Sequence, residues 1–259
     1  MKPHLRSAHL ALSFLLSLGL SPIAWAQPAD TLVAVPHIQL STEEIVTNLI
    51  QRNLERARAL SAYQGTRIYR LEYHGFPGSR AAEMTVDVKY STPGTKEFSI
   101  RSEKGSQLII DRVFKRMLQS EKEAASEEKQ SHVALNRDNY KFTLDGYEST
   151  PSGLAYILSV EPRTGDKLLY RGRIWVDAED FAVIRIDAVP AKNPSFWTKE
   201  TRIEHVYIKV GDFWLPTSNR STSNTRLGGH ALLTIDYTDY KVTAISARPN
   251  STGTVAGSR

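Results

Sequence analysis

Residues 67–101 read RIYRLEYHGFPGSRAAEMTVDVKYSTPGTKEFSIR, and this stretch decides the fold class. Its centre alternates strictly between apolar and polar residues, as in a strand with one buried face. The alternating apolar positions are Met84, Val86, Val88 and Tyr90. Turn signals stand on both sides, FPGS at 76–79 and STPG at 91–94. With residues 67–73 and 96–101 as the flanking strands, the stretch predicts an antiparallel meander.

A helix is predicted before the meander, over residues 41–61. Ser41 and Glu44 have the spacing of a capping box, in which each side chain bonds the other's backbone N–H. Apolar residues follow at helical spacing and form one face that needs cover. They are Ile45, Val46, Leu49, Ile50, Leu54, Ala57 and Leu60.

A second helix is predicted after the meander, from about residue 106 to about 129. Its apolar stripe consists of Ile109, Ile110, Val113, Phe114, Met117 and Leu118. Beyond Leu118 the sequence EKEAASEEK at 121–129 has no apolar face, so we expect the helix to emerge into solvent there.

The second half of the chain predicts seven more strands with turns between them. They are residues 140–144, 154–161, 168–176, 181–188, 202–210, 213–219 and 231–242, with the first turn at 145–146. The predicted fold class is mainly β (α+β). It is a single strongly curved, incompletely closed antiparallel barrel or sheet of about ten strands with two helices.

The N-terminus has the pattern of a secretory signal peptide over residues 1–26. Lys2 and Arg6 precede a short apolar run, and Ala24 and Ala26 form an A-x-A cleavage site. We therefore expect a cleaved leader, an N-terminal lead-in at 27–40, one domain at 41–245 and a flexible tail at 246–259. Because the chain has no cysteine, it cannot carry a lipid anchor on a lipobox cysteine.

Composition and motifs argue against several function classes. The absence of cysteine excludes disulfides, thiolate metal sites and a cysteine nucleophile. The formal net charge is only +5 and the basic residues are interleaved with acids, which argues against nucleic-acid binding. Neither a nucleophile motif nor histidines at metal-ligand spacing are present. We therefore expect no catalytic residues, no metal and no cofactor, and predict that the protein is not an enzyme.

Aromatic residues are the more informative feature. Trp175, the pair Phe196–Trp197 and the pair Phe213–Trp214 accompany many strand tyrosines in the second half of the chain. A curved sheet with an aromatic concave face can enclose a hydrophobic ligand. Aromatic residues also fill ordinary cores, and composition alone leaves both interpretations open.

Several segments resemble the LolA/LolB-like periplasmic lipoprotein-carrier superfamily, which is related to the sensor domain of RseB-like regulators. The resemblance covers about residues 40–242 and is most specific to proteins described as outer-membrane lipoprotein-sorting proteins. The segments that carry it are NYKF at 139–142, YRGRIWVD at 170–177, NPSFW at 193–197, KVGDFWLP at 209–216 and YTDY at 237–240.

The resemblance implies a sheet whose concave face is plugged by the two helices, with acyl chains bound between sheet and helices. Candidate residues for the hydrophobic cavity are then Tyr69, Leu71, Met84, Val86, Val88, Trp175, Phe181, Trp197 and Trp214. Ile45, Leu49 and Ile50 would belong to a lid helix. The family's functional arginine has Arg67 and Arg70 as candidates by strand location only, and its role is not carried over.

The expected function is that of a periplasmic carrier or chaperone for outer-membrane sorting. Its expected partners are the acyl chains of a lipoprotein or another lipid, and transport proteins of the inner or outer membrane; the protein itself would not be integral to a membrane. The alternative is a periplasmic sensing or protein-binding module without transport activity. That module would use a sheet edge or the charged segment 121–129. An extracytoplasmic hydrolase is a third hypothesis, and it lacks a nucleophile–base pair.

Overall fold

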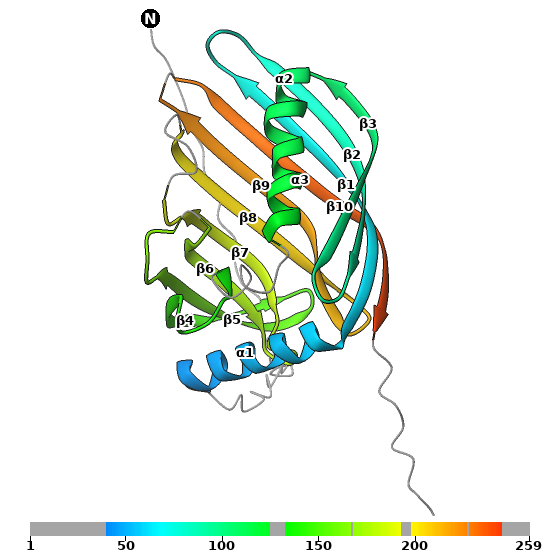
Figure 1. Cartoon of the computed structure of the whole chain (residues 1–259). Coiled ribbons are helices and arrows are strands. Elements are labelled where there is room, and N and C mark those ends of the chain that lie inside the picture. Colours follow the sequence, from blue (N-terminus) through cyan, green and yellow to red (C-terminus); the bar gives the residue numbers. More distant parts are fainter. Residues whose placement is uncertain (1–39, 125–132, 167, 193–197, 227, 245–259) are drawn as a thin grey trace, which may run out of the picture. The chain divides into compact units, whose positions relative to one another are not determined.

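The alternating segments of the sequence pair into one antiparallel sheet in the computed structural model (Figure 1). The structure describes residues 40–124, 133–166, 168–192, 198–226 and 228–244. The chain divides into two units, Met1–Ile38 and Gln39–Arg259, and every described residue belongs to the second. The predictions for the signal peptide, for the helix end beyond residue 124 and for the tail lie outside the described residues.

The described residues form ten strands, as the sequence predicts. They are β1 (Leu60–His74), β2 (Arg80–Ser91), β3 (Thr95–Gly105), β4 (Tyr140–Thr150), β5 (Gly153–Pro162), β6 (Tyr170–Asp177), β7 (Val183–Pro190), β8 (Thr198–Val210), β9 (Phe213–Thr225) and β10 (His230–Ala244). Their order in the sheet is β3-β2-β1-β10-β9-β8-β7-β6-β5-β4, so the first strand pairs with the last. β3 and β4 are the two edges, and the sheet stays open. The predicted fold class is confirmed.

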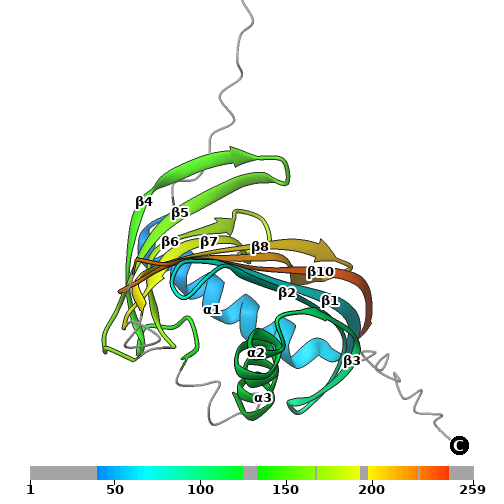
Figure 2. The same cartoon turned by 90° about the horizontal axis from the view of Figure 1, so that it is seen from above.

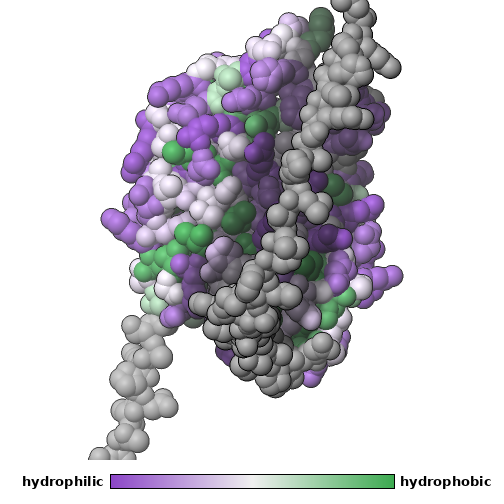
Figure 3. Space-filling view, turned by 180° about the vertical axis from the view of Figure 1, so that it is seen from behind, coloured by the Kyte–Doolittle hydropathy of each residue, from purple (hydrophilic) through white to green (hydrophobic). Residues whose placement is uncertain are grey.

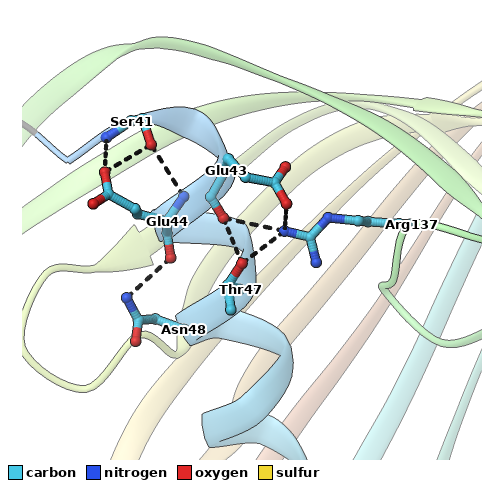
Figure 4. Close-up of polar contacts among 6 residues, drawn as sticks. All are labelled: Ser41, Glu43, Glu44, Thr47, Asn48 and Arg137. Atoms are coloured by element: carbon cyan, nitrogen blue, oxygen red, sulfur yellow. Dashed lines mark hydrogen bonds and ion pairs between the residues drawn. The ribbon is translucent and has the colours of Figure 1, made fainter.

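Helix α1 (Thr42–Ala59) begins at the predicted capping box (Figure 4). Ser41 Oγ accepts from the Glu44 backbone N–H at 3.3 Å, and Glu44 Oε2 accepts from the Ser41 N–H at 2.8 Å. Arg137 fastens the same turn from across the fold, donating to the Glu43 carbonyl and to Thr47 Oγ1. The helix ends two residues before the predicted limit because Leu60 already pairs with Ala244 of β10.

The second helical segment follows β3 without a break and has a local change of pitch. It consists of α2 (Gln107–Ile109), the π-helical turn η1 (Ile110–Phe114) and α3 (Lys115–Ala124). The predicted helix from residue 106 is confirmed, but the π-helical turn is not visible in the apolar pattern. The expectation that the segment leaves the protein after Leu118 is wrong for Glu121, which is half-buried in an ion-pair cluster.

The two helical segments lie on one face of the sheet, and the ends of the sheet bend in opposite directions (Figure 2). Strands β1–β3 curl around α2 and α3, whereas the β4–β5 hairpin curls toward the other face. The predicted turn at residues 145–146 is wrong. β4 instead runs on to Thr150 through a register shift between Leu144 and Gly146, because an extra residue in one strand bends a ladder without ending it.

Buried apolar side chains form three clusters. The first joins α1 to β4–β7 through Ile45, Val46, Leu49, Tyr140, Leu158, Val160, Leu169, Ile174, Val176, Ile186 and Ala188. The second joins α2–α3 to β1, β2 and β10 through Tyr69, Ala82, Met84, Val86, Val88, Ile109, Ile110, Phe114, Leu118 and Ile235. The third contains Ala155, Trp175 and Ile184. Trp175 alternates with Ile174 and Val176 of the first cluster, so the third cluster lies on the opposite face of the sheet.

Candidate ligand cavity and the helices that cover the sheet

A cavity of about 340 Å³ lies between the C-terminal half of α1 and the sheet. Its lining is Asn53, Arg56, Ala57, Leu60, Leu135, Tyr170, Ala182, Val183, Ile186, Tyr207, Phe213, Trp214 and Leu215. The residues of α1 explain why space remains between this helix and the sheet. Its first turns place Ile45 and Leu49 against the sheet with no exposed area. The same helical face continues as Asn53 and Ala57, which are too short to fill the space.

Arg56 is the charged residue in this lining. Its guanidinium donates to the Asp180 carbonyl at 2.8 Å, to the Phe181 carbonyl at 3.1 Å and to Asn53 Oδ1 at 2.7 Å. Burial lowers the pKa of Arg56 from its ordinary value, and nearby acids, Asp180 first, oppose that shift. An arginine nevertheless stays charged at any physiological pH. The side chain therefore ties α1 to the turn between β6 and β7 at the edge of the cavity.

That turn is held in an unusual conformation. Asp177 Oδ1 accepts from the backbone N–H groups of Glu179 and Asp180, at 3.0 and 2.8 Å. Phe181 has φ 49°, in the left-handed region of the backbone that residues other than glycine seldom occupy. Its ring stacks on Tyr156 with 6.3 Å between centroids, which helps to hold the turn. The two carbonyls that Arg56 reaches are thus fixed in place.

Two tyrosines lie on the sheet side of the cavity. Burial raises the pKa of Tyr207 to about 12 and raises that of Tyr170 well above its ordinary value. Within the described part of the chain, neither hydroxyl has a hydrogen-bond partner, whereas the Tyr240 hydroxyl donates to the Pro216 carbonyl at 2.8 Å. The cavity therefore combines apolar walls with a few polar groups, as small-molecule sites do.

The second helical segment is fastened to its part of the sheet by an ion-pair cluster. Arg67 of β1 is 6% exposed and donates to both carboxylate oxygens of Glu121 in α3, at 2.7 and 3.0 Å. Lys96 of β3 contacts the same carboxylate at 2.7 Å. The Arg67 guanidinium also lies over the rings of Tyr237 and Phe98, at 5.0 and 5.7 Å from their centroids.

These charges stabilise one another strongly. Desolvation favours the neutral form of Glu121, but the hydrogen bonds from Arg67 and the charges of Arg67 and Lys96 outweigh it. Together they lower the pKa of Glu121 to about 2. Desolvation likewise opposes the charge on Arg67, yet the bonds to Glu121 raise its pKa. Separating α3 from the sheet would leave a buried cation without its partner, which is costly.

A second cavity, of about 520 Å³, lies on the opposite side of the sheet from α1. Two indole rings border it in fixed orientations: Trp175 Nε1 donates to Glu148 and Trp214 Nε1 donates to Asp180, both at 2.8 Å. Arg185 lies over the Trp175 ring, 4.6 Å from its centroid. Figure 3 views the molecule from this side and shows hydrophobic patches separated by hydrophilic surface.

The structure separates the predicted cavity residues into groups. Tyr69, Met84, Val86 and Val88 are buried beneath α2–α3, with Leu71 packed at their margin. Ile45 and Leu49 of α1 are buried between this helix and the sheet, with Ile50 and Phe181 packed beside them. Trp175 and Trp214 border the opposite-face cavity, and Trp214 also borders the cavity under α1. Trp197 lies outside the described residues. The role of each residue in ligand binding stays a prediction.

Several residues of the α1 cavity were not singled out by sequence reasoning. The helix prediction rests on the apolar face and does not use Asn53 or Arg56, and Tyr170 and Tyr207 belong only to the group of strand tyrosines. A signal was present, because Asn53 and Ala57 continue the apolar face of α1 with a polar and a small residue. That interruption on an inward-facing stripe predicts poor filling.

Two features are absent from the residues that the structure describes. Across these segments no three His, Asp or Glu side chains come together in a way that could hold a metal ion. No helix within the same segments has the length and apolar character needed to cross a membrane.

No protein-family model and no curated protein matches the chain. Three similar solved structures are described here. A domain named for outer-membrane lipoprotein sorting, from Vibrio parahaemolyticus, is 14% identical with a TM-score of 0.40, over 78% of this chain and 93% of that chain. A LolA superfamily protein from Nitrosomonas europaea is 12% identical with a TM-score of 0.32, over 80% and 96%. The MucA/MucB complex of Pseudomonas aeruginosa is 10% identical with a TM-score of 0.25, over 76% and 94%.

Two of these structures carry the family names to which the sequence is similar. Identities and scores this low carry no argument about ligands.

Proposed function

We propose that this protein is a periplasmic carrier or chaperone that holds the acyl chains of a lipoprotein or another lipid on their way to the outer membrane. The observation that supports it is the cavity of about 340 Å³ beneath α1, whose walls are mainly apolar with a few polar groups. Each methylene moved from water into such a site contributes about 0.8 kcal/mol. Binding of this kind needs no reacting group, and the proposed activity includes no chemical step.

The two helical segments have different parts in this mechanism. α1 covers the cavity and is held at its two ends by hydrogen bonds of Arg137 and Arg56, which can break and re-form as a chain enters. α2–α3 covers a second apolar area of the sheet and is locked by Arg67 and Glu121. Releasing that lock would enlarge the apolar surface available to a longer or second chain.

Filling the cavity tests this function. Val183 of β7 is half-buried and lines the cavity, so Val183→Trp should occupy the space and weaken uptake of a fluorescent fatty-acid probe at least tenfold. Val189, on the same strand, is 41% exposed and borders neither cavity, and Val189→Trp should bind as wild type does. Probe titration with detergent-free protein measures both. Absence of binding in the wild type, or equal binding by both variants, would refute the proposal.

The alternative, a sensing or protein-binding module, has one observation in its favour. β3 and β4 are open sheet edges, and an open edge can accept a strand from another protein. Deleting the whole charged segment 121–129 would not separate the two functions, because Glu121 locks α3. A deletion of 125–129 keeps that lock. Loss of partner capture with probe uptake intact would favour the module, and uptake without any partner would favour the carrier.

A further inference from the structure

The charge in the α1 cavity lacks an anionic hydrogen-bond partner. Arg56 donates to two backbone carbonyls and one amide oxygen, all of them neutral. The ion pairs of the described residues include Arg52 with Glu55 on the outer face of the same helix, but none with Arg56. The charges of Asp180, Glu55 and Asp177 act on Arg56 without a hydrogen bond from it to any of their carboxylates. The Asp180 carboxylate is occupied by Lys209 at 2.6 Å and by Trp214 at 2.8 Å.

Arg56 can still donate more hydrogen bonds. A guanidinium has five N–H groups, and the three bonds to Asn53, Asp180 and Phe181 use three of them. Two N–H groups remain for a ligand while α1 stays fastened to the sheet. Charged donors of this kind bind carboxylate and phosphate oxygens best.

The tyrosines supply further donors from the sheet side. The hydroxyls of Tyr170 and Tyr207 have no hydrogen-bond partner among the described residues, although both side chains line the cavity. Both side chains are only partly buried and neither hydroxyl is shut off from the surroundings, so each can donate to a ligand oxygen that enters the cavity. Neither hydroxyl competes for Arg56, which is on the helix side.

We propose that the ligand of this cavity is an amphipathic anion, an acyl chain with a carboxylate or phosphate head that binds Arg56 and the hydroxyls of Tyr170 and Tyr207. This inference rests on the proposed carrier function and adds a ligand class to it. The apolar walls hold the chain and the polar groups select the head. A neutral ester of the same chain would keep the first contribution and lose the second.

Displacement of an uncharged probe separates these contributions. N-phenyl-1-naphthylamine, bound to the full-length mature protein, is displaced by dodecanoate, dodecyl phosphate or methyl dodecanoate. We expect at least one of the two anions to displace the probe at a concentration about tenfold to a hundredfold lower than the ester, the range for a hydrogen bond to a charged group. The anion that displaces the probe at the lower concentration identifies the ligand class: dodecanoate points to a fatty acid and dodecyl phosphate to a phosphorylated lipid.

The variants test the named residues. Arg56→Met should bring the anions to within about threefold of the ester while the ester itself changes little. Arg52→Met, one turn away and 57% exposed, should keep the wild-type preference. Tyr207→Phe should reduce the preference severalfold and leave the ester unchanged. A thermal melt of each variant checks that α1 remains in place.

The outcomes distinguish this inference from the function on which it rests. If wild type binds the anions and the ester equally, the cavity holds acyl chains without recognising the head group. The inference is then wrong, while the carrier function stands. Equal losses for anions and ester in Arg56→Met would also refute it, because Arg56 would then act only by holding α1. If neither probe nor ester binds at all, both proposals fail.

Discussion

A helical segment with an apolar face covers each half of the sheet, but the residues at the ends of the two apolar stripes differ. Under α1 the apolar stripe ends in Asn53 and Ala57, a cavity remains, and the arginine at its edge bonds only neutral acceptors. Under α2–α3 the stripe ends in Leu118 and Glu121, the side chains beneath it form a buried cluster, and the buried Arg67 is paired with a carboxylate. An amphipathic helix on an apolar sheet can thus form a site or a lock, depending on the residues at the end of its stripe.

The largest expected effect is a loss of stability in the half of the sheet covered by α2–α3. Phe114 is fully buried between η1 and the sheet, 5.8 Å from the Tyr69 ring, so Phe114→Ala should lower the free energy of unfolding by about 4 kcal/mol. Urea titration measures it. Leu108→Ala, at a 48% exposed position of the same segment, is the control and should cost under about 1 kcal/mol.

The same pair sharpens the comparison between the halves. If the site lies under α1, folded Phe114→Ala protein should take up the fatty-acid probe within twofold of wild type. A much larger loss of uptake would move the binding site to the α2–α3 half and remove the distinction drawn here.

A smaller effect is expected from the lock in acid. The pKa of Glu121 is about 2 when folded against an ordinary value of 4.5, so its stabilisation is complete above about pH 4.5 and is lost as the pH falls toward 2. Over that interval the unfolding free energy of wild type should fall by up to about 3 kcal/mol more than that of Glu121→Gln. Urea titrations at several pH values test this.

Glu123→Gln, two residues further along α3, serves as the matched control and should keep the wild-type acid dependence. Parallel pH curves for wild type and Glu121→Gln would mean that the Arg67 cluster is not the titrating lock.

The smallest effect concerns how the helices begin. Ser41 caps α1 with its side chain, whereas Ser106, at the start of α2, makes no side-chain cap. Ser41→Ala should therefore cost about 1 kcal/mol of unfolding free energy, and Ser106→Ala should cost a few tenths at most. Thermal melts of the two variants decide it. Equal losses would show that the helix starts do not differ energetically.

Part of this protein could be predicted from the sequence because the signals are local. Strand alternation at residues 84–90 and the capping box at Ser41 depend on neighbours two to four positions apart, and the structure contains both. Local signals fail where pairing supplies the energy. Residues 220–225 of β9 read RSTSNT with no apolar alternation, yet they form strand because β8 and β10 pair with them on both sides. The chain also continues as strand through residues 145–146.

Fold class, the ten strands and the start of each helix were thus set by the order of residues along the chain, through the two-residue and 3.6-residue repeats of strand and helix. Tertiary structure alone decided that Arg67 meets Glu121, 54 positions away, and that Arg56 shares a cavity with Tyr170 and Tyr207. It also decided which face of the sheet carries Trp175. A cavity is a mismatch in volume between elements distant in sequence, so the pattern of α1 can indicate poor filling at Asn53 and Ala57 but cannot say which side chains line the space.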